Sequence, residues 1–251
     1  MDTSTIFGAG LVIFLAGTAH SVVGFGYSLF ATPLLVMIGI PLPRAITLVA
    51  TCSLFQSGLG TIALRRHVPW RTVFSAVAVR VAGMLVGILY LKKLAALNMD
   101  HMRLTVGLVL CALVLLQMLW KPRPVPKSHW GWAGLAFSSS GILAGLVGMG
   151  GPPLVLWLMA HDWTTRRIRG FLFAVFTTTL PLQLGLLTLT FDVSILRYAG
   201  LGLAFVPLVF LGSRIGLPLG DRMPRAGLRR VAYLILLVIG GSAVLQALLS
   251  E

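Results

Sequence analysis

The chain has 251 residues, of which 57% are apolar and only 10% carry a formal charge, whereas roughly 25% of residues in soluble domains are charged. This composition excludes a soluble globular domain. A helix needs about 20 largely apolar residues to cross a bilayer, so the chain has room for about ten spans and for no sizeable extramembrane domain. We therefore predict an all-α polytopic membrane protein.

The net charge of +14 does not indicate a nucleic-acid partner. The basic residues form short clusters between apolar runs, which is typical of topology signals and not of one basic binding face. The two cysteines, Cys52 and Cys111, lie inside apolar runs without the spacing of a zinc site. The sequence also lacks a GxxxxGK[ST] phosphate loop and an HExxH motif. We expect no metal, no cofactor, no ATP-driven transport and no enzymatic activity.

Ten apolar runs follow one another along the chain, five on each side of the segment KPRPVPK at residues 121–127. The three prolines of this segment prevent a continuing helix, and its three basic residues suit a cytoplasmic loop. We expect residues 1–126 and 127–251 to form two transmembrane repeats. The runs lie at residues 5–23, 27–40, 45–64, 72–91 and 104–120, and then at 130–147, 152–160, 170–190, 195–213 and 231–249.

Recurring glycines favour a duplication of one half into the other. Three glycines of the first half recur at a constant offset of 124, as from Gly17 to Gly141, and two more recur at an offset of 129, as from Gly83 to Gly212. The matching pairs are Gly17 and Gly141, Gly24 and Gly148, Gly26 and Gly150, Gly83 and Gly212, and Gly87 and Gly216.

The first two runs of each repeat, taken together, are too long for one straight span. Residues 5–40 would form a helix of about 54 Å, compared with a hydrocarbon core of about 30 Å. The motifs VVGFGYS (22–28) and VGMGGPP (147–153) are the expected breaks, because glycine permits strained backbone and Pro152 and Pro153 suit the first turn of a new helix. Each repeat would then begin with a broken helix or a helical hairpin, followed by three transmembrane helices.

Loop charges favour the hairpin. If each break reverses the chain, one side of the membrane carries five Lys and Arg and the other fourteen, whereas a single crossing gives a split of seven to twelve. The hairpin implies inverted repeats in the inner membrane, with both termini on the non-cytoplasmic side. The five residues of the less basic side are Arg44, Lys92, Lys93, Arg103 and Arg197.

Helices that begin inside the membrane predict an anion site. Their first N–H groups lack partners and their dipoles are positive at this end, so two converging ends attract an anion. Close helix packing is the alternative role of such glycines, and we favour it for Gly83, Gly87, Gly212 and Gly216. The candidate substrate-binding residues at the two breaks are Gly24, Gly26, Tyr27, Ser28, Gly148, Gly150 and Gly151.

Two ionisable side chains fall inside apolar runs, where a charge is expensive. Arg80 would either neutralise a bound anion or contact exposed carbonyl groups, and His20 would either carry a proton or form an interhelical hydrogen bond. His161 and Asp162, which precede the basic residues Arg166, Arg167 and Arg169, are expected in a solvated loop. Uncharged groups that could replace water around an oxyanion, or else join helices, are Ser53, Gln56, Thr178 and Gln183.

The glycine turn and following stretch GFGYSLFATPLLVMIGIPLPRAI (24–46), the echo GLVGMGGPPLVLWLM (145–159) and the duplicated layout resemble the sulfite exporter TauE/SafE family of membrane transporters. The resemblance implies a secondary transporter of sulfite, sulfonates or related small anions. Residues that depart from the family's fuller glycine run are Tyr27, Ser28, Pro152 and Pro153. Residues that match it are Gly24, Gly26, Pro33, Gly148, Gly150 and Gly151.

We therefore expect a secondary transporter that moves a small anion, sulfite or an organosulfonate, across the inner membrane by alternating access. Its partners would be the anion and the lipid bilayer. Protons or sodium are the candidate coupling ions, with His20 as the candidate proton carrier. A passive anion channel and a transporter of a small carboxylate are the alternatives.

Overall fold

The computed structural model describes residues 2–23, 26–120, 130–222 and 225–249, and these fold into ten α-helices and two 3-10 turns, with no strand. The predicted all-α class and the order of the ten apolar runs are confirmed. The first half contains α1 (Thr3–Val23), α2 (Tyr27–Met37), α3 (Leu42–Leu64), α4 (Trp70–Ala95) and α5 (Met99–Leu119). The second half contains α6 (Trp130–Val147), α7 (Gly151–Met159), α8 (Thr165–Phe191), α9 (Leu196–Arg222) and α10 (Arg225–Leu249).

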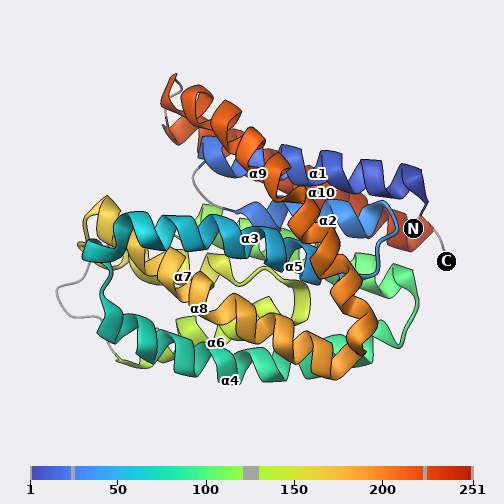
Figure 1. Ribbon diagram of the computed structural model, residues 1–251, viewed down its shortest axis with the longest axis horizontal. Coiled ribbons are helices and arrows are strands. Elements are labelled where there is room, and N and C mark those ends of the chain that lie inside the picture. The colour runs from blue at the N-terminus through green and yellow to red at the C-terminus, as the bar shows by residue number, and fades with distance from the viewer. Residues whose placement is uncertain (1, 24–25, 121–129, 223–224, 250–251) are drawn as a thin grey trace.

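Seven of the described helices are long and apolar enough to cross a membrane, namely α1, α3, α4, α5, α8, α9 and α10. The long helices lie side by side along the long axis of the molecule (Figure 1). Large apolar side chains face outward on them, such as Phe7 at 77% exposure and Leu189 at 85%. Such a surface fits contact with lipid acyl chains.

The chain reverses direction between α1 and α2. Near the start of α1, a Cβ on Gly8 would lie 3.7 Å from Cδ1 of Ile38, which follows the end of α2. Near the end of α1, Nδ1 of His20 accepts a hydrogen bond from the backbone N–H of Tyr27 at 3.2 Å. Both contacts require antiparallel helices, and Figure 1 shows α2 returning toward the end at which α1 begins.

The chain reverses again between α6 and α7. The ring of Phe137 in α6 lies 4.9 Å from that of Trp157 in α7, measured between centroids. Closer to the turn, the N–H of Met149 donates to the carbonyl of Leu143 at 3.2 Å. Each half therefore begins with a hairpin and not with a broken helix that crosses once.

Positive φ angles explain two of the turn glycines. Gly26, which precedes α2, has a φ of 87°, and Gly148 has a φ of 74°. This left-handed conformation costs other residues about 1–2 kcal/mol. Gly24 lies outside the described residues.

The two halves pack through corresponding contacts. Helix α6 packs along α4 as α1 packs along α9, and the pairs α3–α8 and α5–α10 join the halves. The four glycines related by the offset of 129 leave no room for a Cβ against the facing helix, so the backbones approach closely, as small residues allow in membranes. In these contacts Gly83 and Gly87 face the backbone of Ser138 and Ile142, and Gly212 and Gly216 face that of Phe14 and Thr18.

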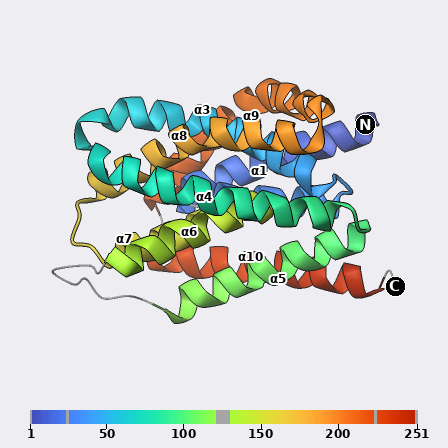
Figure 2. The same cartoon turned by 90° about the horizontal axis from the view of Figure 1, so that it is seen from below.

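The less basic end of the molecule gathers the start of α3 and the α4–α5 and α8–α9 turns. A second cavity of about 350 Å³ lies there, with Arg44, Met99 and Ser194 among its lining residues. Helix α1 begins on this side and α10 ends there (Figure 2). The opposite end carries the 3-10 turn Arg65–His67.

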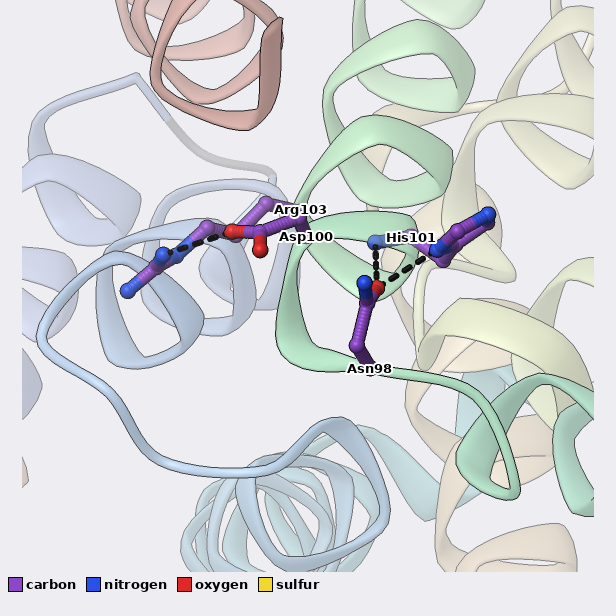
Figure 3. Close-up of polar contacts among 4 residues, drawn as sticks. All are labelled: Asn98, Asp100, His101 and Arg103. Carbon is purple, nitrogen blue, oxygen red and sulfur yellow. Dashed lines mark hydrogen bonds and ion pairs between the residues drawn. The ribbon is translucent and has the colours of Figure 1, made fainter. Parts of the chain in front are cut away.

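The start of α5 at the less basic end is defined by its side chains (Figure 3). Oδ1 of Asn98 accepts a hydrogen bond from the N–H of His101 at 3.0 Å, which satisfies one of the N–H groups left free in the first turn. Arg103 forms an ion pair with Asp100 at 3.1 Å on the same turn. These contacts end the α4–α5 turn and start the helix at Met99.

Candidate functional site

A cavity of about 340 Å³ lies where the two hairpin turns meet α3, α4, α8 and α9. It brings together residues that the sequence analysis took from both halves of the chain. Eleven of the thirteen candidates line it, namely His20, Gly26, Tyr27, Ser28, Ser53, Gln56, Arg80, Gly148, Gly150, Gly151 and Gln183.

Helices α3 and α8 each present one face to this cavity. The lining residues of α8 recur at intervals of three and four, as Arg169, Phe173, Phe176, Leu180 and Gln183 do, which is the spacing of one helical face. Thr178 falls off this face, and its hydroxyl donates to the carbonyl of Ala174 at 2.8 Å. The structure therefore does not place Thr178 with the other candidates, because two positions after Phe176 the helix has turned away.

Arg80 is the buried charge of the cavity. The residue is 2% exposed, and its Nε and Nη1 atoms have no hydrogen-bond partner in the described part of the chain. The one ion pair that the described residues form, Arg103–Asp100, is elsewhere. A buried charge without a counter-ion is strongly destabilising, so this guanidinium is chemically suited to pair with an anion.

Two glycines, Gly141 and Gly150, allow the guanidinium of Arg80 to lie close to the start of α7. Gly141 in α6 faces the backbone carbonyl of Arg80, where a Cβ would not fit, so α6 and α4 approach closely there. A Cβ on Gly150 would lie 2.8 Å from Nη2 of Arg80 and 2.5 Å from the carbonyl of Ser140. The φ of Gly150 is −79°, an ordinary value. Gly150 is therefore required for space, whereas Gly148 is required for its backbone conformation.

The two helix tips at the cavity offer different numbers of N–H donors. At the start of α2, the N–H of Tyr27 is already bonded to His20. At the start of α7, Pro152 and Pro153 have no N–H. The positive end of each helix dipole remains, and Arg80 adds a full charge beside the tip that has lost two donors.

His20 acts as a cap for α2 in this structure. Its Nδ1 accepts from the N–H of Tyr27, and a ring nitrogen can accept only with its lone pair free, as in the neutral imidazole. The proton-carrier role of His20 stays a prediction.

The two glutamines of the cavity have different partners. Nε2 of Gln183 donates to the carbonyl of Ala144 at 2.8 Å, a buried hydrogen bond between α8 and α6. Nε2 of Gln56 lies 3.5 Å from the hydroxyl of Ser213 in α9. An amide nitrogen carries two protons, so each glutamine retains one for a ligand.

Arg169 was not among the predicted site residues, because the apolar run was taken to begin at residue 170. The structure places Arg169 in α8, which begins at Thr165, and the hydroxyl of Thr164 accepts from the N–H of Arg167 at 3.4 Å. His161 and Asp162 lie before this helix, in the expected loop. Arg169 is therefore helical, exposed and part of the cavity lining. The capping threonine and the regular spacing from Arg169 to Gln183 are the signals that could have revealed it.

Phe176 was also missed. The guanidinium carbon of Arg80 lies 4.9 Å from the centroid of its ring. An aromatic residue in an apolar run shows nothing in the sequence that distinguishes it from other core residues.

The model of the family described as "Sulfite exporter TauE/SafE" matches residues 9–243. The chain belongs to the TauE/SafE family. This protein is also similar to the "Probable sulfite/organosulfonate exporter TauE" of Cupriavidus necator, with 27% identity over 244 residues that cover 93% of this chain and 91% of the relative. No solved structure shows a significant match. The family confirms the resemblance drawn from the glycine turns and makes this TauE/SafE protein a membrane transporter of the exporter type.

Proposed function

We propose that this protein is a secondary transporter that carries a small anion, sulfite or an organosulfonate, across the inner membrane by alternating access. The observation that carries the proposal is the buried guanidinium of Arg80, whose Nε and Nη1 have no hydrogen-bond partner among the described residues, in a cavity shared by two helix N-termini. A full positive charge and two positive dipole ends around one cavity favour an anion and exclude a cation. The similar exporter of Cupriavidus necator supports the sulfur oxyanion.

Each side of the cavity has its own part in this proposal. Arg80 supplies the charge that neutralises the anion, and the turns at Gly26 and Gly150 let its oxygens approach backbone N–H groups. Gln56 and Gln183 offer amide protons without adding charge. Gly24, Tyr27, Ser28, Gly148, Gly151 and Ser53 complete the proposed binding set.

Alternating access is supported by the position of the cavity along α8. The cavity reaches Arg169, which is exposed near the basic end of the molecule, the side that loop charge assigns to the cytoplasm. Toward the other end of α8, Gln183 is followed by the fully buried Leu187 and then by Phe191, which lines the second cavity. Leu187 therefore lies between the two cavities along this helix. The structure thus fits a cytoplasm-facing state, in which an exporter receives its cargo.

Inverted repeats at residues 1–126 and 127–251 would supply the opposite state. The corresponding contacts α1–α9 and α6–α4 support this relationship. If the two repeats exchanged conformations, the cavity would close toward the cytoplasm and open toward the opposite side of the membrane. Both termini would lie on the non-cytoplasmic side.

The direct test is uptake of labelled sulfite into proteoliposomes, with sulfoacetate, sulfate, thiosulfate and a small carboxylate as competitors. We expect saturable uptake that is lost in Arg80→Gln and retained in Arg71→Gln, which alters an exposed arginine of the same helix outside the cavity. Uptake that survives Arg80→Gln unchanged would contradict the proposed site. If only the carboxylate inhibits uptake, the substrate is a small carboxylate and not a sulfur oxyanion.

Counterflow separates a carrier from a passive anion channel. We expect unlabelled sulfite inside the vesicles to accelerate entry of labelled sulfite. The reason is that the binding site of a carrier returns to the outside faster with substrate bound than empty, whereas a channel has no such step. Flux without saturation or acceleration would favour the channel. If protons are coupled, a pH gradient should drive uptake by the wild type and not by His20→Gln.

A further inference from the structure

The guanidinium of Arg80 has an aromatic ring where a counter-ion would be expected. Its carbon lies 4.9 Å from the centroid of Phe176, within the range of a cation–π contact. Arg80 belongs to α4 and Phe176 to α8, so the contact joins the two halves of the chain. Both residues line the main cavity.

We infer that Phe176 is the positioning residue of the anion site: its ring holds the guanidinium of Arg80 beside the tip of α7 while the cavity contains no anion. This inference rests on the proposed function. It adds a reason why the guanidinium of Arg80 can remain in place and available to a substrate although no described carboxylate pairs with it.

The contact between the guanidinium of Arg80 and the ring of Phe176 is weaker than an ion pair. A cation over a ring face is held more weakly than a cation in a charge-assisted hydrogen bond. An arriving anion can therefore pair with the guanidinium without first displacing a carboxylate. An acidic residue at position 176 would form a permanent ion pair with Arg80 and would compete with every anionic substrate.

The position of the ring next to the tip of α7 supports this role. A Cβ on Gly151, the first residue of α7, would meet Cζ of Phe176 at 4.0 Å. On the other side, Nη2 of Arg80 lies against Gly150. The ring, the guanidinium and the positive end of α7 are thus contiguous, and Nε and Nη1 of Arg80 have no hydrogen-bond partner within the described ranges of the chain.

Phe173 provides a matched comparison. It lies one turn earlier on α8 and lines the same cavity, but its ring packs over Gly60 of α3, where a Cβ would stand 2.5 Å from Cδ2 of the ring. A general loss of aromatic packing should affect both phenylalanines, whereas a role in holding Arg80 should affect Phe176 alone.

The experiment compares Phe176→Leu, Phe176→Tyr, Phe176→Trp and Phe173→Leu in reconstituted sulfite uptake. We expect Phe176→Leu to raise KM about 3- to 30-fold, the range of a cation–π contact, with kcat changed less than threefold. The two aromatic replacements should restore KM to within threefold of the wild type. An unchanged KM in Phe176→Leu, an equal rise in Phe173→Leu, or no rescue by either aromatic residue would overturn the inference.

A second measurement keeps the inference testable apart from transport. Phe176→Glu should lower the thermal unfolding midpoint of the purified protein much less when Arg80 is present than in the Arg80→Gln background, because the new carboxylate needs the arginine as its partner. The same variant should lose sulfite uptake. A shift that does not depend on Arg80 would overturn the contact, whereas a dependent shift in a protein that transports no anion would refute the proposed function alone.

Discussion

Nη2 of Arg80 lies 2.8 Å from the point that a Cβ on Gly150 would occupy. The arginine and the glycine are 70 positions apart in the chain, in α4 and in the turn before α7. Their proximity places a full positive charge at the start of a helix, where the dipole is also positive. The guanidinium of Arg80 and the positive end of the α7 dipole repel each other, so an anion between them would stabilise the arrangement.

Gly150→Ala tests this proximity. The added methyl group would overlap the guanidinium and the carbonyl of Ser140, and overpacking of this kind costs about 1–3 kcal/mol. We expect the affinity for sulfite to fall at least tenfold, measured as KM of uptake. Gly58→Ala is the control, because a Cβ there meets nothing within 4 Å; equal behaviour of the two variants would contradict the steric argument.

Arg80→Met should separate stability from function. Removing a buried charge that has no counter-ion among the described residues relieves an electrostatic penalty, and replacements of buried ionic groups by apolar ones are often neutral or stabilising by about 1–4 kcal/mol. We expect the unfolding midpoint in detergent to stay equal or rise while uptake is lost. A clear fall in the midpoint would indicate that Arg80 is a structural residue.

The left-handed glycines differ in their distance from the site. Gly26 and Gly39 have φ angles of 87° and 93°, but only Gly26 lines the main cavity. Alanine at either position should destabilise the protein by about 1–2 kcal/mol. Only Gly26→Ala should also raise KM for sulfite. Thermal unfolding and uptake measured on both variants check this, and a KM effect of Gly39→Ala would argue against a local role.

Arg169 should act at the mouth of the cavity through long-range attraction. Arg169→Gln is expected to raise KM several-fold at low ionic strength, with the effect disappearing near 1 M salt, where the Debye length is about 3 Å. Lys92→Gln is the control, because this exposed cation lies in the last turn of α4, at the less basic end of the molecule, and does not line the main cavity. A KM effect that persists at high salt would instead indicate direct contact with the substrate.

Membrane topology can be checked by cysteine labelling after Cys52 and Cys111 are replaced by alanine. Leu97 and His67 are exposed at opposite ends of the molecule, in the α4–α5 turn and in the 3-10 turn after α3. We expect Leu97→Cys to react with an impermeant reagent from outside and His67→Cys only after the membrane is opened. The reverse pattern would overturn the orientation deduced from loop charge.

The helices were largely predictable because apolar runs in a membrane protein are set by the thickness of the bilayer. The residues at which the helices begin and end were less predictable. The apolar run at 170–190 belongs to α8, which begins at Thr165, and the run at 195–213 belongs to α9, which continues to Arg222. Helical structure extends beyond the hydrocarbon core into charged residues, where hydropathy no longer marks it.

The sequence by itself determined the class of the protein, the number and order of its helices, the glycine turns and the residue types suited to an anion. Those properties depend on local composition and on spacing within one helix. Only the tertiary structure decided that Arg80 faces Phe176, that Arg169 reaches the cavity and that Thr178 does not. Each of these depends on which helices pack together and on the rotation of each helix about its axis, and both are set by close packing between segments far apart in the chain.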